Sequence, residues 1–244
     1  MSNTENAVEV SSLTVAYNSK PVLDNVDLEL PRGMLTAVMG PNGAGKTTLI
    51  KAMLGLIPRV EGQISFPKIN GKKPCIGYVP QSESIDRDFP VSVLDVVTMG
   101  CYGRIGWVKR PTRDDRNFAM AMLKKTGMEE FAKRQISQLS GGQQQRTFIA
   151  RALAQRADVY LMDEPFKGVD SDTEKSIIAL LKELRTAGKT VVAVHHDLST
   201  VSDYFDWVTL INMKVVANGE VKKVFTDENL NLTYRRVGKA GAAL

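Results

Sequence analysis

The stretch Gly40-Pro41-Asn42-Gly43-Ala44-Gly45-Lys46-Thr47 is the part of this 244-residue sequence that decides the fold. It matches the pattern G-x-x-x-x-G-K-[ST] and lies between an apolar run at residues 35–39 and a predicted helix at residues 46–56. Glycines let backbone N–H groups curl around phosphate oxygens, and the start of a helix adds partial positive charge. The alternative is a glycine-rich turn that binds nothing, but the flanking strand and helix favour a phosphate-binding loop.

Every position of this loop is a candidate for contact with ATP. We expect Lys46 to reach the β- and γ-phosphates, the Thr47 hydroxyl to ligate Mg²⁺, and Thr48 to face the α-phosphate. The predicted ATP-binding residues of the loop are therefore Gly40, Pro41, Asn42, Gly43, Ala44, Gly45, Lys46, Thr47 and Thr48.

An acidic pair follows a second apolar run. Residues 159–162 predict a buried strand, and Asp163 and Glu164 come directly after it. Asp163 is placed to hold Mg²⁺, and Glu164 can polarise the water that attacks the γ-phosphate. A strand that ends in a polar turn is the alternative for the pair by itself. Downstream of a phosphate loop, the pair favours nucleotide hydrolysis.

The sequence around these two motifs predicts an α/β fold. Residues 8–17 and 22–30 alternate apolar and polar side chains, as half-buried antiparallel strands do, and residues 64–66 and 76–79 are further strand candidates. A final hairpin is expected at Asn218-Gly219, because this dipeptide favours a type I′ turn. Strands and helices alternate in the second half of the chain, which implies parallel β-α-β units, at residues 159–162, 173–185, 190–194 and 198–204.

The middle of the chain has a different character. From residue 89 to residue 156 the periodicity predicts helices at 93–99, 113–125 and 143–154, with little strand signal between them. This region is therefore expected to be a helical insertion within the α/β chain.

A third motif, Leu139-Ser140-Gly141-Gly142-Gln143, precedes the last of these helices and forms a second candidate anion site at a helix N-terminus. Ser140 as an ordinary helix cap is also consistent, but it does not explain why two glycines follow. Together with the phosphate loop and the acidic pair, this motif resembles the signature of the ABC ATPase family. The resemblance implies a P-loop NTPase fold with a RecA-like core, an N-terminal antiparallel β subdomain and an inserted α-helical subdomain at about residues 85–156, within one nucleotide-binding domain spanning 1–244.

The resemblance also implies a head-to-tail homodimer. Each ATP would lie between the phosphate loop of one chain and the signature of the other, at Ser140, Gly141, Gly142 and Gln143. Asp170, in Gly168-Val169-Asp170, falls in the loop that crosses the dimer interface in this family.

The same resemblance implies roles for three single residues, and strand geometry implies one for a fourth. Tyr17 corresponds to an aromatic residue that stacks on adenine, although a lone Tyr on a strand otherwise packs in a core. Gln81 corresponds to the glutamine that contacts Mg²⁺ or the lytic water. His196 directly precedes Asp197-Leu198, as does the histidine that contacts the γ-phosphate. Adjacent strand residues point to opposite faces, so we expect His195 to be structural.

Composition excludes several other classes of protein. Cys75 and Cys101 are the two cysteines, and their spacing indicates neither a disulfide framework nor a zinc site. The N-terminus lacks the features of a signal peptide, and no apolar stretch approaches the roughly 20 residues that a membrane span needs. The net charge of +5 is spread along the chain without a basic stripe, so a nucleic-acid partner is not expected.

Other stretches resemble the ATPases of manganese, zinc and iron-chelate uptake systems, namely Tyr78-Val79-Pro80-Gln81-Ser82, Tyr102-Gly103-Arg104-Ile105-Gly106-Trp107 and Val194-His195-His196-Asp197-Leu198. The resemblance implies an ATPase subunit that powers import of a divalent metal, manganese ahead of zinc or iron. Its partners would be membrane permease subunits and an extracytoplasmic metal-binding protein. The subunit would be located at the cytoplasmic face of the inner membrane. The alternative is a soluble ABC ATPase in cofactor assembly or another role outside transport.

A docking groove is expected at residues 84–97, where Phe89 and Val91 would form an apolar floor for a permease helix. The alternative is that both side chains belong to the core of the helical insertion.

Overall fold

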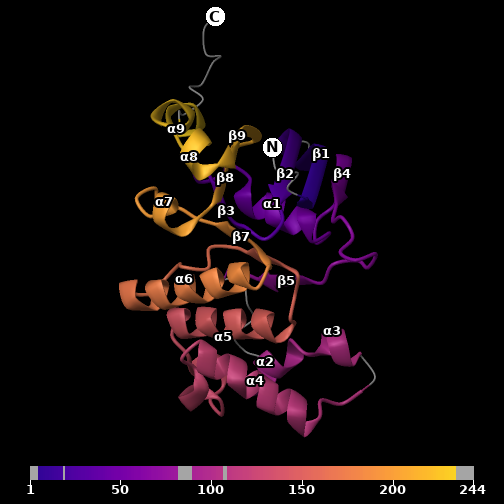
Figure 1. Ribbon diagram of the computed structural model, residues 1–244, viewed down its shortest axis with the longest axis vertical. Coiled ribbons are helices and arrows are strands. Elements are labelled where there is room, and N and C mark those ends of the chain that lie inside the picture. The colour runs from indigo at the N-terminus through magenta and orange to yellow at the C-terminus, as the bar shows by residue number, and fades with distance from the viewer. Residues whose placement is uncertain (1–4, 19, 82–89, 107–108, 235–244) are drawn as a thin grey trace, which may run out of the picture.

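The computed structural model describes residues 5–18, 20–81, 90–106 and 109–234, and these build two sheets with helices packed around them (Figure 1). The smaller sheet is antiparallel, in the order β2-β1-β4. It consists of β1 (Asn6–Tyr17), β2 (Lys20–Pro31) and β4 (Glu61–Ser65). The apolar and polar alternation at residues 8–17 and 22–30 therefore does mark an antiparallel pair.

The larger sheet runs in the order β5-β6-β7-β3-β8-β9. Its strands are β3 (Leu35–Met39), β5 (Ile76–Val79), β6 (Val159–Met162), β7 (Thr190–Val194), β8 (Trp207–Asn212) and β9 (Lys214–Glu220). All neighbouring pairs are parallel except β8 with β9. Because β6, β7 and β3 are neighbours, the loops that leave their carboxyl ends meet at one edge of the sheet.

This sheet is buried on both faces, which explains the continuous apolar runs of its strands. In β6, Tyr160 and Met162 pack into one hydrophobic cluster, and Val159 and Leu161 pack into another. The second cluster also contains β1, β2 and α1 (Lys46–Met53). The first contains α6 (Ser171–Thr186) and the helical region described next.

The helical region lies at one end of the molecule (Figure 1). It contains α2 (Val93–Met99), α3 (Tyr102–Ile105), α4 (Arg113–Lys125) and α5 (Gly141–Ala154), with two 3₁₀ turns at Glu129–Phe131 and Ile136–Gln138. Capping boxes at Thr112 and Ser140 begin α4 and α5, so local side chains satisfy the first orphan N–H groups of both helices. Three short helices complete the chain: α7 (Val201–Tyr204), α8 (Val221–Val224) and α9 (Asp227–Tyr234).

The predicted type I′ turn at Asn218-Gly219 is wrong. Both residues lie inside β9, and the hairpin between β8 and β9 turns at Met213, whose φ is 60°. The Asn218 side chain instead accepts hydrogen bonds from Trp207 Nε1 at 2.7 Å and Thr209 Oγ1 at 2.9 Å, and donates one to the Glu29 carbonyl at 2.9 Å. Asn218 therefore joins β9 to β8 and to β2.

The largest differences from the predicted helix boundaries occur at the end of α1 and at the start of α7, whereas α5 and α6 differ from prediction by two residues or fewer at each end. The helix predicted at residues 46–56 ends at Met53, before Gly55 with its φ of 68°. The helix predicted at residues 198–204 begins only at Val201, because the Asp197 carboxylate accepts hydrogen bonds from the Ser199 amide and hydroxyl in a local turn.

The predicted docking groove is described only from residue 90 onward. Phe89 lies outside the described residues, and Val91 is half-buried against the larger hydrophobic cluster. Within the described ranges, no helix is both long and apolar enough to cross a bilayer.

Candidate functional site

The phosphate loop leaves β3 and enters α1 in a backbone shape that needs glycine. Gly43 and Gly45 have φ values of 82° and 94°, in the left-handed region. A Cβ on Gly40 would overlap the Ile211 carbonyl oxygen, and one on Gly45 would lie 2.9 Å from the Val22 carbonyl. The loop is therefore held tightly between β8 and β2.

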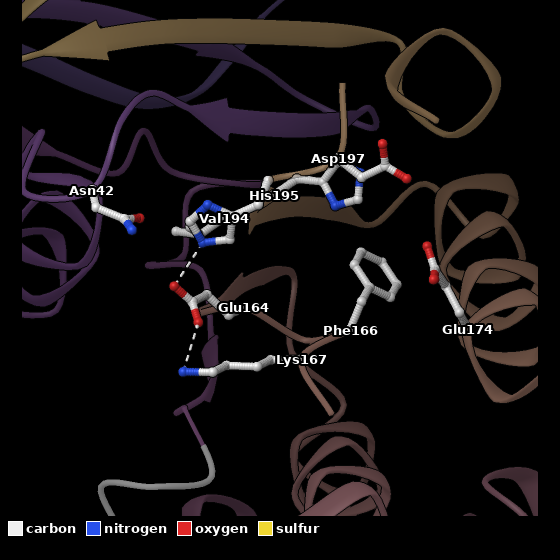
Figure 2. A pocket seen from close by; sticks show the side chains of 9 residues that line it. Asn42, Glu164, Phe166, Lys167, Glu174, Val194, His195 and Asp197 are labelled. Atoms are coloured by element: carbon white, nitrogen blue, oxygen red, sulfur yellow. Dashed lines mark hydrogen bonds and ion pairs between the residues drawn. The ribbon is translucent and has the colours of Figure 1, made fainter. Parts of the chain in front are cut away.

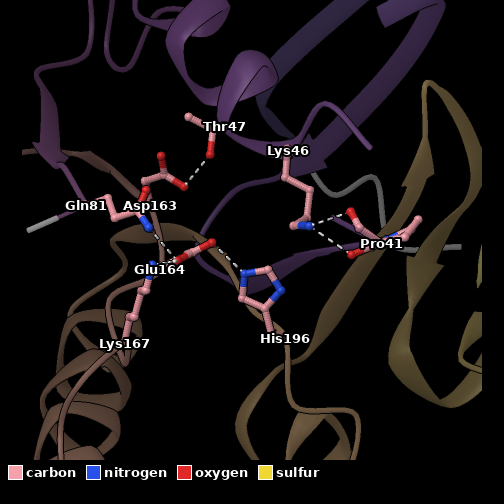
Figure 3. Close-up of polar contacts among 9 residues, drawn as sticks. Pro41, Lys46, Thr47, Gln81, Asp163, Glu164, Lys167 and His196 are labelled. Atoms are coloured by element: carbon pink, nitrogen blue, oxygen red, sulfur yellow. Dashed lines mark hydrogen bonds and ion pairs between the residues drawn. The ribbon is translucent and has the colours of Figure 1, made fainter. Parts of the chain in front are cut away.

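Lys46 is folded back into this loop. Its Nζ donates hydrogen bonds to the carbonyls of Gly40 at 2.8 Å and Pro41 at 2.9 Å, and the residue is 6% exposed (Figure 3). Burial lowers the pKa of Lys46, while the charges of Glu164 and Asp163 act in the opposite direction. An ammonium carries three donors, so one remains for a ligand.

A cavity of about 240 Å³ opens in front of the loop. It is lined by Glu164, by Val22 and by the loop residues Asn42, Gly43, Ala44, Gly45, Lys46, Thr47 and Thr48. Backbone amides at the start of α1 have no partner within the helix, which suits this cavity to the oxygens of a phosphate group.

Asp163 and Thr47 meet beside this cavity. The Thr47 hydroxyl donates to Asp163 Oδ1 at 3.0 Å, and Asp163 is only 1% exposed (Figure 3). Burial raises the pKa of Asp163 above its ordinary value, and the hydrogen bond from Thr47 opposes that shift. A hydroxyl and a carboxylate side by side are the hard oxygen donors that Mg²⁺ prefers, so this pair fits the ion.

Glu164 has side-chain partners from three segments. Its Oε1 lies 2.6 Å from His196 Nε2, and its Oε2 lies 2.8 Å from Gln81 Nε2 and 3.6 Å from Lys167 Nζ (Figure 3). An ionised carboxylate only accepts, so the facing nitrogens carry the protons. Gln81, Glu164 with Asp163, and His196 thus converge from the ends of β5, β6 and β7, and Thr47 joins them from the first turn of α1.

The two histidines separate as their places on the chain predict. His195 is buried, and its Nε2 lies 2.8 Å from Thr200 Oγ1. Its ring packs edge-on against Phe166, with centroids 5.4 Å apart, and burial lowers its pKa to about 4. His196 is exposed and faces Glu164. Both line a second cavity of about 520 Å³, which also borders Glu164 and Lys167 (Figure 2).

The signature motif lies apart from these cavities. Ser140 Oγ accepts from the Gln143 amide at 3.3 Å, and Gln143 Oε1 accepts from the Ser140 amide at 2.9 Å. A Cβ on Gly141 would meet nothing within 4 Å, whereas one on Gly142 would lie 3.0 Å from the Gly168 carbonyl. None of the four signature residues lines either cavity among the residues that the structure describes.

Two further predicted residues stand outside the cluster. Asp170 begins α6 as its N-cap and accepts hydrogen bonds from the amide and the hydroxyl of Thr173, both at 2.9 Å. Tyr17 ends β1 with 49% of its surface exposed and does not line the phosphate-loop cavity. Val22 lines that cavity instead.

Sequence reasoning missed Val22 and Lys167. Val22 follows the turn after Tyr17, and no motif marks it. Lys167 had a signal, because Glu164-Pro165-Phe166-Lys167 places a cation three residues after the candidate base, within one turn.

Comparison with known proteins finds the same architecture elsewhere. The family model described as ABC transporter matches residues 23–167. The manganese transport system ATP-binding protein MntB of Bacillus subtilis is 57% identical over 93% of this chain and 92% of its own length. The zinc transport system ATP-binding protein TroB of Treponema pallidum is 50% identical over 96% and 89%.

Two solved structures support the same grouping. A metal-chelate type ABC transporter in an inward-facing conformation aligns with a TM-score of 0.81 and 32% identity, over 93% of this chain and 88% of the other. A dimeric ATP-binding cassette in a post-hydrolysis state with ADP and phosphate aligns with a TM-score of 0.77 and 29% identity, over 88% and 98%.

Proposed function

This chain belongs to the ABC transporter family as one of its ATPases, and we propose that it powers import of a divalent metal ion, manganese ahead of zinc and iron. The observation that carries the catalytic part is the convergence of Gln81, Glu164 and His196 beside the phosphate loop. The cargo is proposed from the relatives that are named as manganese and zinc transport ATPases.

We assign the chemistry to this chain's own residues. Lys46 and the amides of residues 40–48 would bind the phosphates of ATP, and Tyr17 would stack on the adenine. Thr47, Asp163 and Gln81 would hold Mg²⁺, which when bound neutralises charge on the phosphate oxygens. Glu164 would orient the attacking water and accept its proton, and His196 would contact the γ-phosphate.

The second half of each site would come from another copy of the chain. In the proposed head-to-tail homodimer, Ser140, Gly141, Gly142 and Gln143 of one copy face the ATP on the other, and Asp170 lies at the interface. This arrangement is supported by the open space at Gly141 and by the fact that no signature residue is among those that line the two cavities.

The proposed assembly has further members. We propose one nucleotide-binding domain over residues 1–244, with a helical subdomain at about residues 85–156, docked peripherally on permease subunits at the cytoplasmic face of the membrane. An extracytoplasmic metal-binding protein would deliver the cargo. These assignments rest on the relatives' names as ATP-binding subunits of transport systems.

Replacement of Glu164 by Gln tests the catalytic part. The Gln side chain keeps the shape but cannot accept a proton, so hydrolysis should fall about 10²–10⁴-fold while ATP still binds. With Mg-ATP the variant should accumulate as a dimer on size exclusion, and Glu61→Gln, at an exposed position of β4, serves as the control carboxylate. Wild-type turnover by Glu164→Gln would overturn the assignment.

Growth of a deletion strain tests the cargo. In chelator-treated medium, growth should return when manganese is added back, and more weakly with zinc or iron, only if the wild-type chain is also supplied. The Glu164→Gln chain should not support that growth. Rescue by none of the three metals would overturn the metal assignment, and leave the ATPase in place for a role outside transport.

A further inference from the structure

Among the partners of Glu164 in the described part of the chain, Lys167 is the lysine, a side chain that pairs with a carboxylate as a cation. Gln81 is neutral, and His196 is charged only when it holds a second proton. Lys167 Nζ lies 3.6 Å from Glu164 Oε2, and the side chain of Glu164 is only 17% exposed (Figure 2). The ion pair therefore concerns a carboxylate that is largely shielded from water.

The pair is built into a single turn. The Lys167 amide donates to the Glu164 carbonyl at 3.1 Å, which closes the turn Glu164-Pro165-Phe166-Lys167. Pro165 restricts the first corner of this turn, and Glu164 itself has a φ of 51°, a left-handed conformation that costs energy for a residue with a Cβ. The turn thus keeps the two residues close along the chain, and the Lys167 ammonium folds back to within ion-pair distance of the Glu164 carboxylate.

Lys167 lies outside the phosphate-loop cavity. Glu164 lines both that cavity and the larger neighbouring cavity, whereas Lys167 lines only the larger one, which Asn42 of the loop also borders. Lys46 is the lysine that the loop itself encloses. The contact through which we expect Lys167 to act on the reaction is therefore its ion pair with Glu164.

We propose that Lys167 is a positioning residue for ATP hydrolysis: it holds the Glu164 carboxylate against Gln81 and His196, at the mouth of the phosphate-loop cavity. The inference rests on the proposed role of Glu164. It adds a third support, from the segment that follows the acidic pair, to the two that come from the ends of β5 and β7.

The test is Lys167→Met in the transporter purified with its permease, with Lys167→Arg beside it. We expect kcat to fall about threefold to tenfold in Lys167→Met, because a misplaced reacting group costs rate rather than affinity. The KM for ATP should stay within about twofold, and Lys167→Arg should recover most of the rate since it keeps the charge. Lys223→Met removes a similar i,i+3 ion pair, with Glu220 at 2.8 Å, and should leave kcat unchanged.

A double-variant cycle separates this proposal from the proposed role of Glu164. In the Glu164→Gln background, Lys167→Met should cause less than about a twofold further loss, because both changes act through one carboxylate. An undiminished further loss, a rise in KM that matches the fall in kcat, or an unchanged kcat in Lys167→Met would each overturn the positioning role. Wild-type turnover by Glu164→Gln alone would instead overturn the role of Glu164.

Discussion

The phosphate loop and the signature motif are both predicted anion-binding sites at helix N-termini, but they differ in how much of their structure the chain completes. The loop is closed: Lys46 is held by two loop carbonyls, and Gly40 and Gly45 have no room for a side chain. The signature is open: its capping box is satisfied within the chain, and Gly141 faces empty space. In the proposed homodimer, one half of the composite site would therefore be preformed, and the other half would act only against a second copy of the chain.

The largest effect should come from the open half. Ser140→Arg should lower hydrolysis by the assembled transporter about 10²–10³-fold, the usual cost of losing a phosphate-side donor. ATP binding by the isolated chain should stay within twofold, because Ser140 lines neither cavity. Ser140→Ala controls for the lost helix cap. Normal hydrolysis by Ser140→Arg would mean that the two halves do not form one site.

The closed half should respond in the isolated chain. Lys46→Met removes a charged donor from the cavity, so the Kd for ATP should rise about 10–100-fold in equilibrium binding. Lys73→Met, at an exposed lysine away from the cavity, should bind as the wild type does. Normal ATP binding by monomeric Lys46→Met would contradict the claim that the phosphate loop is a preformed binding site.

The two adjacent histidines also differ, because His195 is buried in the fold and His196 faces Glu164 in the candidate site. His195 keeps a pKa of about 4, whereas the unfolded chain has the ordinary value of 6.5. The unfolded state therefore binds a proton first as pH falls, so the stability that neutral His195 provides is complete above pH 6.5 and is lost toward pH 4. Between pH 6.5 and about pH 5 the loss should be about 1.5 kcal/mol.

Urea unfolding at both pH values measures that loss. His195→Gln has no imidazole to protonate, so its pH dependence should be flatter than that of the wild type by the same amount. Equal slopes in the two proteins would show that His195 is not a structural, neutral histidine.

The smallest effect distinguishes the two signature glycines. Alanine replaces glycine in a helix with a gain of about 0.5–1 kcal/mol when nothing blocks it. Gly141→Ala should therefore raise the free energy of unfolding. The free energy of unfolding of Gly142→Ala should be about 1 kcal/mol lower than that of Gly141→Ala, because the Cβ at position 142 would press on the Gly168 carbonyl. Thermal unfolding of both variants checks the order. The reverse order would place the packing constraint at Gly141.

Much of this structure could be predicted from the sequence because its signals are local. Strands β3, β5, β6 and β7 begin and end where their apolar runs do, since each run is buried on both faces. Asp163, Glu164 and His196 fall just after the ends of β6 and β7, and Thr47 follows the loop that leaves β3, which is why these four residues meet. Their meeting also required β7 to lie between β6 and β3, and no local pattern specifies that order.

The failures have non-local causes. Asn218-Gly219 is a dipeptide that favours a turn, but the Asn218 side chain forms hydrogen bonds with Trp207, Thr209 and the Glu29 carbonyl, which come from elsewhere in the chain. The position of Val22 at the cavity has no local signal, because only the path of β2 brings it there. A partner for Glu164 at Lys167 depended on the side chain folding back over its own turn.

The pairing of β3 with β7 has a consequence for how the protein is made. Leu35 pairs with Val191 and Val38 with Val194. The strand that precedes the phosphate loop, β3, therefore cannot pair with β7 until residues far later in the chain have been made. Its other neighbour, β8, supplies Ile211 against Gly40 and comes later still. Contacts of such large sequence separation form slowly, and a nascent chain that ends before β7 has the loop without its support. The emerging polypeptide is therefore expected to bind ATP only after β7 and β8 have been made and have paired with β3.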